Sequence, residues 1–592
     1  MLHRNNLTSV WKNHIRSAVR QQAIRDLSDY YDVHLAIDDH SHQIREQTLQ
    51  GIYRPRPPTV VLQEKSKGLC RQLVVPDPID ALTLQVTVNA VTKSILGNQP
   101  SKNAFYQPQS AFINKTREER FRDAGYGSPY SWLAFQKAIF NFTRECSFLV
   151  VTDIANYYDH IDLEEVRNVF GSFDGVREDL LDFLFFTLSH FHWRPDYRPV
   201  HSMGLPQINF DAPRIVAHAF LFELDRFLNA KTPGRFVRYM DDIDIGVESI
   251  GQAKQIVRDV DLALKTRGVR LNSGKTRILT AAQASRHFFV RENEALNLAE
   301  SAFERKKGKG LPTERESRFV QAYVERKLAE KEDYFDQGNG EKILKRYLSL
   351  SMRIGYQIPD ETLRQFVILR PSLRELALLC LAHYGYAPKR LMIVYDFLLS
   401  DQRIDDASMF HAAFTLVHTN CPASGPNHTR LLLLTRKLSV LGPIGLGSAI
   451  WLLSKYGTQR QLLELVDANF NVWANDDWVG RQVGSLYPRF KRNRKAFSQF
   501  RSLIVRSRNR GAQSTFSMHT KILESQYSFQ SIYHFLKASV PSLPRGVAHH
   551  KILILMTFMS SAAPKLLKTK LATVVGGWKI DSTTKRLLKP YL

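Results

Sequence analysis

The chain has 592 residues, more than one hydrophobic core normally supports, so we expect at least two domains. Its 44% hydrophobic and 11% aromatic residues can build sizeable cores, which excludes a globally disordered protein. The 82 Lys and Arg against 57 Asp and Glu give a net charge of +25, which favours a polyanionic partner such as nucleic acid.

Cysteine usage and hydropathy indicate a cytoplasmic protein. The four cysteines are scattered and form no C-x-x-C pair, which excludes a disulfide framework and a cysteine-based zinc module. The first residues lack the apolar core of a signal peptide. The charge-free run 407–429 is too polar to span a bilayer, and the run 438–454 is broken by Pro and Gly. We therefore expect no membrane contact.

The N-terminal part of the chain predicts helices followed by a basic hairpin. Residues 11–49 have a helical pattern, which three prolines within 53–58 interrupt. Two short β-branched runs, 59–63 and 69–76, flank a Lys-Ser-Lys-Gly segment, and this arrangement predicts a hairpin. A helix is expected to follow, over about 77–96.

The middle of the chain mixes apolar strands with amphipathic helices. The predicted strands are 148–152, 236–239 and 243–247, and the predicted helices are 215–228 and 251–266. Interleaved patterns of this kind indicate an α+β domain.

From about residue 301 onward the strand signals fade. A highly charged helical stretch, 300–347, leads into amphipathic helices separated by Pro and Gly. These helices are predicted at 373–381, 390–399, 430–438 and 459–466. Their recurrence favours an all-α, HEAT-like solenoid, although the sequence shows no fixed repeat period.

The last 115 residues, 478–592, hold most of the excess charge. They contain 21 Lys or Arg and two acids, a net +19, which leaves +6 for the rest of the chain. The basic residues alternate with Tyr487, Phe490, Phe497 and Phe500. Cations neutralise phosphates and aromatic rings can stack on bases, so one interpretation is a nucleic-acid-binding segment and the other is a solvated basic face over buried aromatics. The residues expected to bind nucleic acid are Arg481, Arg489, Lys491, Arg492, Arg494 and Lys495.

Three acids form the sharpest chemical signal. Asp241 and Asp242 lie between two β-like runs, and the strand 148–152 ends at Asp153. Three carboxylates brought together would repel, since each pair near 4 Å costs about 4 kcal/mol at an effective dielectric constant of about 20. Two Mg²⁺ ions held by Asp153, Asp241 and Asp242 would relieve that repulsion and could activate a 3′-hydroxyl for nucleotidyl transfer.

The order of three short strings resembles a known family. Asp153-x-x-x-Tyr-Tyr-Asp159, Gly204-Leu-Pro-Gln207 and Tyr239-Met-Asp-Asp242 are similar to motifs A, B and C of reverse transcriptases, which are RNA-directed DNA polymerases. The resemblance covers about residues 50–290. It implies an α+β right-hand polymerase with fingers, palm and thumb, a nucleotidyltransferase that uses two Mg²⁺ ions, deoxynucleotides, RNA and a DNA product. In this chain we expect an all-α domain to follow the polymerase region.

Further positions match the family residue by residue. Arg71, assisted by Lys65 or Lys67, resembles the fingers residues that hold the incoming triphosphate. Gln207 and Tyr239 resemble residues that line the nucleotide pocket. Lys275 resembles the motif D lysine that can protonate pyrophosphate, so it joins the three acids as a candidate catalytic residue.

The resemblance implies that Tyr158, the fifth residue after the motif A acid, contacts the sugar of the nucleotide. In the family an aromatic there blocks a ribose 2′-hydroxyl, which implies synthesis from deoxynucleotides. The segment Ser110-Ala-Phe112 resembles a short motif between fingers and palm. The residue after Gln207 is Ile208, where the family usually has glycine.

The predicted domains are four: N-terminal helices and fingers at 1–130, the palm at 131–295, a charged helical thumb or connector at 296–350, and a helical domain with a basic tail at 351–592. A polymerase joined to a helical, repeat-like half is similar to bacterial abortive-infection and defence-associated reverse transcriptases. This similarity implies antiphage defence through DNA synthesis, on a bound non-coding RNA or without template, as a homo-oligomer or with a partner defence protein.

Two alternatives stay open. The chain could be a mobile-element reverse transcriptase that copies its own intron or retroelement RNA. It could also be a nucleic-acid-binding scaffold with a vestigial polymerase pocket.

Overall fold

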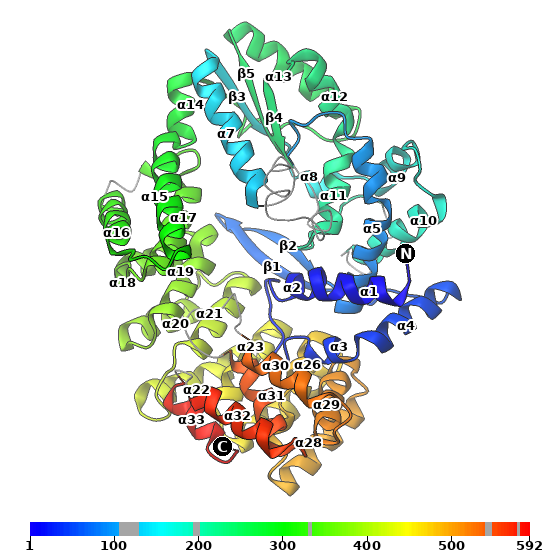
Figure 1. Cartoon of the computed structure of the whole chain (residues 1–592), viewed down its shortest axis with the longest axis vertical. Helices are drawn as coiled ribbons and strands as arrows, with labels where there is room; N and C mark the ends of the chain where they lie inside the picture. The colour runs from blue at the N-terminus through cyan, green and yellow to red at the C-terminus, as the bar shows by residue number, and fades with distance from the viewer. Residues whose placement is uncertain (106–128, 193–201, 330–333, 539–547, 577–579, 592) are drawn as a thin grey trace. The chain divides into compact units, whose positions relative to one another are not determined.

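The computed structural model describes residues 1–105, 129–192, 202–329, 334–538, 548–576 and 580–591, and for 129–133 the backbone only (Figure 1). These residues form two compact units. Unit 1 comprises 1–18, 37–58 and 74–343, and unit 2 comprises 19–36, 59–73 and 344–592. This division differs from the predicted domains, because two segments of the expected fingers region, 19–36 and 59–73, pack with the C-terminal half.

Unit 1 is built on a four-stranded antiparallel sheet with strand order β4-β5-β3-β6. The strands are β3 (Phe148–Asp153), β4 (Phe236–Tyr239), β5 (Asp242–Val247) and β6 (Arg277–Thr280). The three strands that the sequence predicts are confirmed. β6 was not predicted, because its four residues are half-buried or exposed and show no apolar alternation.

Helices cover both faces of this sheet. An apolar core joins Leu149 and Val237 to α7 (Pro129–Glu145) and α14 (Ala281–His287). The backbone of β5 approaches Cys146 so closely that a Cβ on Gly246 would lie 2.5 Å from its Sγ, so only glycine fits there. The amphipathic helix α13 (Ile250–Lys265) packs on β3 and β5 through its buried side chains, namely Ala253, Ile256, Val260 and Leu264.

The remaining helices of unit 1 surround the sheet. They are α1 (Arg4–Val10), η1 (Trp11–Ile15), α2 (Arg16–Val19), α4 (Ile37–Leu49), α5 (Pro78–Gly97), α8 (Tyr157–His160), α9 (Leu163–Gly171), α10 (Glu178–His190), α11 (Asp211–Phe220), α12 (Phe222–Lys231), α15 (Val290–Gly308) and α16 (Glu314–Leu328). The helix α17 (Gly340–Ile354) begins in unit 1 and continues from residue 344 into unit 2. α5 confirms the predicted helix 77–96, with Asp77 capping its first turn. The predicted helix 215–228 is two helices, since Leu221 leaves the helical conformation.

Unit 2 contains the predicted hairpin and a series of helices. The hairpin is β1 (Thr59–Ser66) and β2 (Leu69–Val75), turning through left-handed Lys67 and Gly68. Arg374 binds Glu64 at 2.9 Å and Asp405 at 3.3 Å, and these buried ion pairs explain why the hairpin belongs to this unit.

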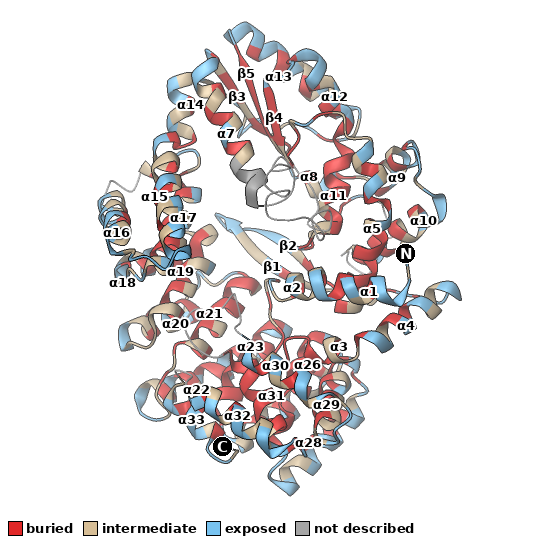
Figure 2. Cartoon of the chain, in the orientation of Figure 1, coloured by how far each residue is buried: buried red, intermediate tan, exposed pale blue. Residues whose placement is uncertain are grey.

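The helices of unit 2 confirm the predicted helical half. They are α3 (Tyr31–Leu35), α18 (Asp360–Leu369), α19 (Pro371–Tyr384), α20 (Pro388–Leu399), α21 (Asp406–His418), α22 (Pro426–Ser439), α23 (Gly442–Tyr456), α24 (Gln459–Ala468), α25 (Phe470–Ala474), α26 (Asp477–Gly484), α27 (Tyr487–Phe490), α28 (Arg494–Ser507), α29 (Arg510–Leu523), α30 (Phe529–Lys537), α31 (His549–Ser560), α32 (Lys565–Gly576) and α33 (Ser582–Leu588). α18, α20 and α22 pack in one row, and α19, α21 and α23 pack in a second row against it. Buried residues concentrate in α23 and α31 (Figure 2). No helix in the described part of the chain is long and apolar enough to cross a membrane.

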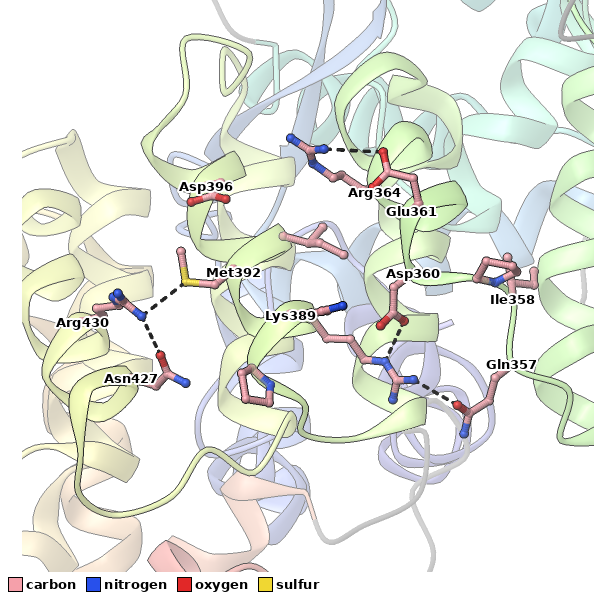
Figure 3. Close-up of a pocket in the computed structure, with 14 residues that line it drawn as sticks. Gln357, Ile358, Asp360, Glu361, Arg364, Lys389, Met392, Asp396, Asn427 and Arg430 are labelled. Carbon is pink, nitrogen blue, oxygen red and sulfur yellow. Dashed lines mark hydrogen bonds and ion pairs between the residues drawn. The ribbon is translucent and has the colours of Figure 1, made fainter.

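A cavity of about 720 Å³ opens in unit 2 beside the first turns of α18, α20 and α22 (Figure 3). Its arginines are paired within the wall. Arg390 binds Asp360 at 2.8 Å, and Arg430 donates to Asn427 at 2.9 Å. The first pairing neutralises Arg390, whereas Arg430 keeps its positive charge because Asn427 is neutral.

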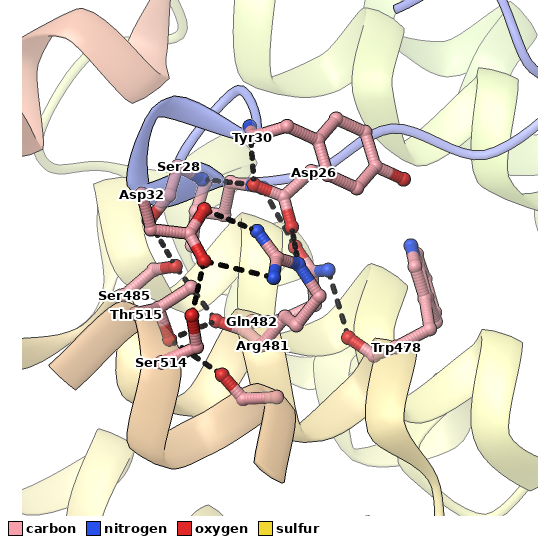
Figure 4. A network of polar contacts seen from close by, with 12 residues as sticks. Asp26, Ser28, Tyr30, Asp32, Trp478, Arg481, Gln482, Ser485, Ser514 and Thr515 are labelled. Carbon is pink, nitrogen blue, oxygen red and sulfur yellow. Dashed lines mark hydrogen bonds and ion pairs between the residues drawn. The ribbon is translucent and has the colours of Figure 1, made fainter. Parts of the chain in front are cut away.

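A buried polar network holds residues 19–36 in unit 2 (Figure 4). The Arg481 guanidinium donates to Asp26 at 2.7 Å and to Asp32 at 2.6 Å, and Ser514 donates to Asp32 at 2.5 Å. Both ends of the network are buried, so the ion pairs are held away from water.

Two of the residues expected to bind nucleic acid are therefore corrected. Arg481 is only 6% exposed, and its donors are taken up by Asp26 and Asp32. Arg489 is also 6% exposed and donates to the carbonyl oxygens of Ser454 and Gly457. Charge density along the sequence does not reveal this burial. Both arginines stabilise the fold of unit 2 and are not available to phosphates.

Candidate active site

The sheet register brings the three predicted acids together. In the antiparallel pair β3–β5, Asp153 lies directly opposite Asp242. Asp241 occupies the tight turn between β4 and β5, where Met240 takes a left-handed φ of 58°. The Ile154 amide donates to the Asp241 carbonyl at 3.2 Å, which fixes the turn beside the end of β3. All three acids thus lie at one end of the central strands.

The site is electrostatically strained by burial and like charges. Asp153 is 6% exposed, and its Oδ1 has no hydrogen-bond partner among the described residues. Burial, together with the charges of Asp242 and Asp153, raises the pKa of Asp241 to about 6. A cation would stabilise the ionised form of this group.

Two lysines already supply positive charge at the acids. Lys275 Nζ donates to Asp153 Oδ2, and Lys342 Nζ lies 4.0 Å from Asp242 Oδ2. The loop that carries Lys275 is fixed against β3, since the Asn272 amide donates to the Asp153 carbonyl at 2.8 Å. The structure therefore places the predicted Lys275 at the predicted acids, whereas Lys342 was not singled out from the sequence.

The donor set suits a hard divalent cation. All three side chains offer carboxylate oxygens, which Mg²⁺ prefers, and Asp153 keeps a buried acceptor without a donor. In this conformation no three His, Cys, Asp or Glu side chains of the described residues are grouped closely enough to hold a metal ion. Asp153, Asp241 and Asp242 are the residues that would hold one.

The acid-bearing turn rests on a buried ion pair that the sequence does not reveal. Arg238, fully buried on β4, donates to Asp225 of α12 at 2.6 and 2.5 Å. Its third nitrogen donates to the Met240 carbonyl at 2.9 Å, directly before Asp241. The signal that could have found it is an arginine in the otherwise apolar run Phe-Val-Arg-Tyr. Arg238 thus acts as a positioning residue for the turn.

Hydrogen bonds bring the predicted nucleotide-pocket residues Tyr158 and Gln207 close to each other. The Leu205 amide donates to the Tyr158 carbonyl at 2.7 Å, and the Gln207 side chain donates to Asp159 at 3.2 Å. Gly204 has a φ of +101°, which only glycine adopts without strain. The half-buried Tyr158 therefore lies beside the Gly-Leu-Pro-Gln segment, and Ile208 after it is buried.

The other predicted pocket residues lie on β4 and on the β1–β2 hairpin. Tyr239 lies on β4 next to the turn, with its ring 5.6 Å from that of Phe135. Lys67 and Arg71 are exposed on the β1–β2 hairpin, which belongs to unit 2, so their contact with a triphosphate stays a prediction. The Ser110-Ala-Phe112 segment lies outside the described residues.

A second buried carboxyl lies at the start of α5. Asp80 accepts hydrogen bonds from the Tyr53 hydroxyl at 2.7 Å and from the Arg56 amide at 2.9 Å. Burial and the nearby Asp77 raise the pKa of Asp80 to about 7. Because the folded pKa exceeds the unfolded one, the folded state binds more protons over about pH 4 to 7, and stability falls as the pH rises through that window.

We expect Asp80→Asn to remove this pH dependence. Its effect on the free energy of unfolding has an upper limit of about 4 kcal/mol, from a shift of about 3 pKa units at 1.36 kcal/mol each. Thermal unfolding of both proteins at about pH 5 and about pH 8 measures it, with exposed Asp174→Asn as control. The interpretation is wrong if the wild-type and Asp80→Asn midpoints shift equally with pH.

Comparison with known proteins agrees with this geometry. Residues 82–313 match the family described as reverse transcriptase (RNA-dependent DNA polymerase). The match is somewhat less than half of the chain and includes the whole four-stranded sheet, the three acids and Lys275. No curated protein matches the chain. The matched segment has a palm-type polymerase fold.

Proposed function

We propose that Asp153, Asp241 and Asp242 hold two Mg²⁺ ions for the polymerisation of deoxynucleotides. The premise is the match of residues 82–313 to the reverse transcriptase family, which indicates an RNA-directed DNA polymerase. The observation that carries the proposal is the register that sets Asp153 opposite Asp242, with Asp241 in the adjoining turn. When bound, the ions would activate the 3′-hydroxyl and neutralise the triphosphate. We also propose that the polymerase region is divided into fingers, palm and thumb.

Lys275 is the proposed proton donor. Its ammonium donates to Asp153, where it compensates the charge of that buried carboxylate. In the reaction it donates a proton to the leaving pyrophosphate, which lowers the negative charge that develops there. Arg71 and Lys67 are the proposed ligands of the triphosphate, and Gln207 and Tyr239 line the nucleotide pocket.

Tyr158 is the proposed sugar gate, supported by its place beside Gly204–Gln207. We expect Tyr158→Val to lower the preference for deoxynucleotides over ribonucleotides by at least about tenfold, because a smaller side chain no longer clashes with a 2′-hydroxyl. The ratio of kcat/KM for the two substrates measures this. Tyr158→Phe keeps the ring and should keep the preference. An unchanged ratio in Tyr158→Val would contradict the assignment.

The biological role that we propose is antiphage defence. Support comes from the chain architecture, a polymerase domain joined to the paired helices α18–α23, which resemble a HEAT-like repeat. Synthesis would use a bound non-coding RNA or no template, in an oligomer or with a partner protein. Cells that carry the chain should resist phage plating, and cells that carry Asp241→Asn should not. Equal plating on both would remove the defence role.

One incorporation experiment tests the polymerase activity and its template. The purified chain is incubated with labelled deoxynucleotides and Mg²⁺, with and without RNase, beside Asp241→Ala. Loss of product after RNase treatment indicates an RNA template, and persistence indicates untemplated synthesis. A product that copies neighbouring intron RNA would identify a mobile-element enzyme. Equally little product from both proteins under every condition would leave a vestigial scaffold.

A further inference from the structure

The outer side of α28 presents a row of cations. The helix buries Phe500, Leu503 and Ile504 against unit 2. On the opposite side Arg494, Lys495 and Arg501 are exposed, and exposed Arg508 caps the C-terminal end. We call these four residues the basic face of α28.

The spacing of three arginines aligns them along the helix axis. Arg494, Arg501 and Arg508 are seven residues apart, and seven residues advance an α-helix by nearly two turns and about 10.5 Å. Arg494 and Arg501 therefore share one side of α28, and Arg508 follows at the left-handed C-cap, about 21 Å from Arg494 along the axis at the helical rise. Between them on that side lie the exposed Ser498 and Ser502, which are small and polar, and Val505, which is apolar and 64% exposed.

No acid of the described residues forms an ion pair with the basic face. None of its four cations has an ion pair or hydrogen bond with another described residue, and residues 482–523 contain no acid. Neighbouring cations differ. Arg492 donates to the Pro590 carbonyl at 2.5 Å, and Arg506 lies 4.0 Å from Asp467. Four like charges along one helix repel, and this repulsion is relieved only by an external anion or by salt.

The aromatic residues near this face are not available for stacking. Tyr487, Phe490 and Phe500 are at most 2% exposed, and the rings of Phe490 and Phe500 stack on each other at 4.5 Å. The part of the sequence interpretation that expected aromatic platforms for bases is thus wrong for these three residues. What remains at the surface is charge.

We propose that the basic face of α28 binds the phosphate backbone of a nucleic-acid strand without reading its bases. A length of about 21 Å is enough for several consecutive phosphates of one strand. Lys491 is exposed just before the helix, and its ammonium lies 4.7 Å from the centre of the Phe497 ring of α28. The surface lies outside residues 82–313, so the proposal does not depend on polymerase chemistry.

The test is the salt dependence of binding by the full chain. The variant R494Q/R501Q/R508Q is compared with wild type on single-stranded RNA and single-stranded DNA, each in a purine-rich and a pyrimidine-rich sequence. For single strands each neutralised phosphate contributes about 0.7 to the slope of log K against log salt, so three lost contacts should make the slope shallower by about 2. Affinity at about 50 mM salt should fall by at least about tenfold, equally for both base compositions.

The control R436Q/K437Q/K537Q removes the same charge from other exposed positions of unit 2 and should keep the wild-type slope. A slope change with RNA alone identifies RNA as the occupant, and one with DNA alone identifies the DNA product. An unchanged slope, an equal change in the control, or a loss confined to one base composition overturns the proposal. If the triple variant does not fold, R501Q alone should change the slope by about 0.7.

Discussion

Asp241→Asn abolishes deoxynucleotide incorporation, with an expected fall in kcat of at least about a thousandfold. The substitution keeps the shape of the side chain and removes one of the three charges at the end of β3 and β5. It also removes a buried charge and its repulsion with Asp242 and Asp153, which together raise the pKa of Asp241 to about 6, so we expect the thermal midpoint to stay the same or rise. Loss of activity without loss of stability is the signature of a metal-binding carboxylate.

Incorporation rates and thermal unfolding of the same preparations measure both effects. Asp174→Asn, at an exposed loop position in unit 1, is the matched control and should behave as wild type. If Asp241→Asn retains activity within tenfold of the wild type, the acids do not carry the chemistry.

Arg238→Met destabilises unit 1 by about 3–5 kcal/mol, because it leaves Asp225 buried, charged and without its partner. Both side chains of this pair are fully buried, so water cannot compensate the loss. The Met240 carbonyl also loses its donor, and the turn that holds Asp241 is no longer fixed. Denaturant unfolding and incorporation assays measure the two consequences.

The double variant Arg238→Met/Asp225→Leu separates stability from positioning. Replacing both members of a buried pair by apolar groups is often nearly neutral, so we expect most of the stability to return. Activity should stay low, because methionine cannot donate to the Met240 carbonyl. Full recovery of activity in the double variant would show that Arg238 has only a stabilising role.

The central strands and the acids could be predicted because their signals are local. A continuous apolar run predicts β3 and alternating apolar residues predict β5, and the acids at the end of β3 and the start of β5 predict the site. The pair Arg238–Asp225 could not be predicted in this way, because burial of a charge depends on tertiary packing. Lys342 reaches Asp242 from a helix about a hundred residues further along the chain, with no local pattern to indicate it.

The division into units and the role of the basic tail were also beyond local patterns. Arg481 is buried by Asp26 and Asp32, more than 440 residues away in the sequence, and Arg374 holds Glu64 of the hairpin. A count of basic residues treats Arg481 and Arg501 alike, although one is fixed in a core and the other is exposed. Only the three-dimensional contacts separate stabilising cations from those that can meet a phosphate.

Iron-directed cleavage tests the central claim, that Asp153, Asp241 and Asp242 together hold divalent cations. Fe²⁺ replaces Mg²⁺ in the purified chain, ascorbate and peroxide generate hydroxyl radicals at the bound ion, and the fragments are mapped by mass spectrometry. We expect cuts close to Asp153 and to Met240–Asp242, suppressed by excess Mg²⁺ and by Asp241→Asn. Cuts elsewhere, or cuts near these acids that persist in Asp241→Asn, would contradict the assignment of this site.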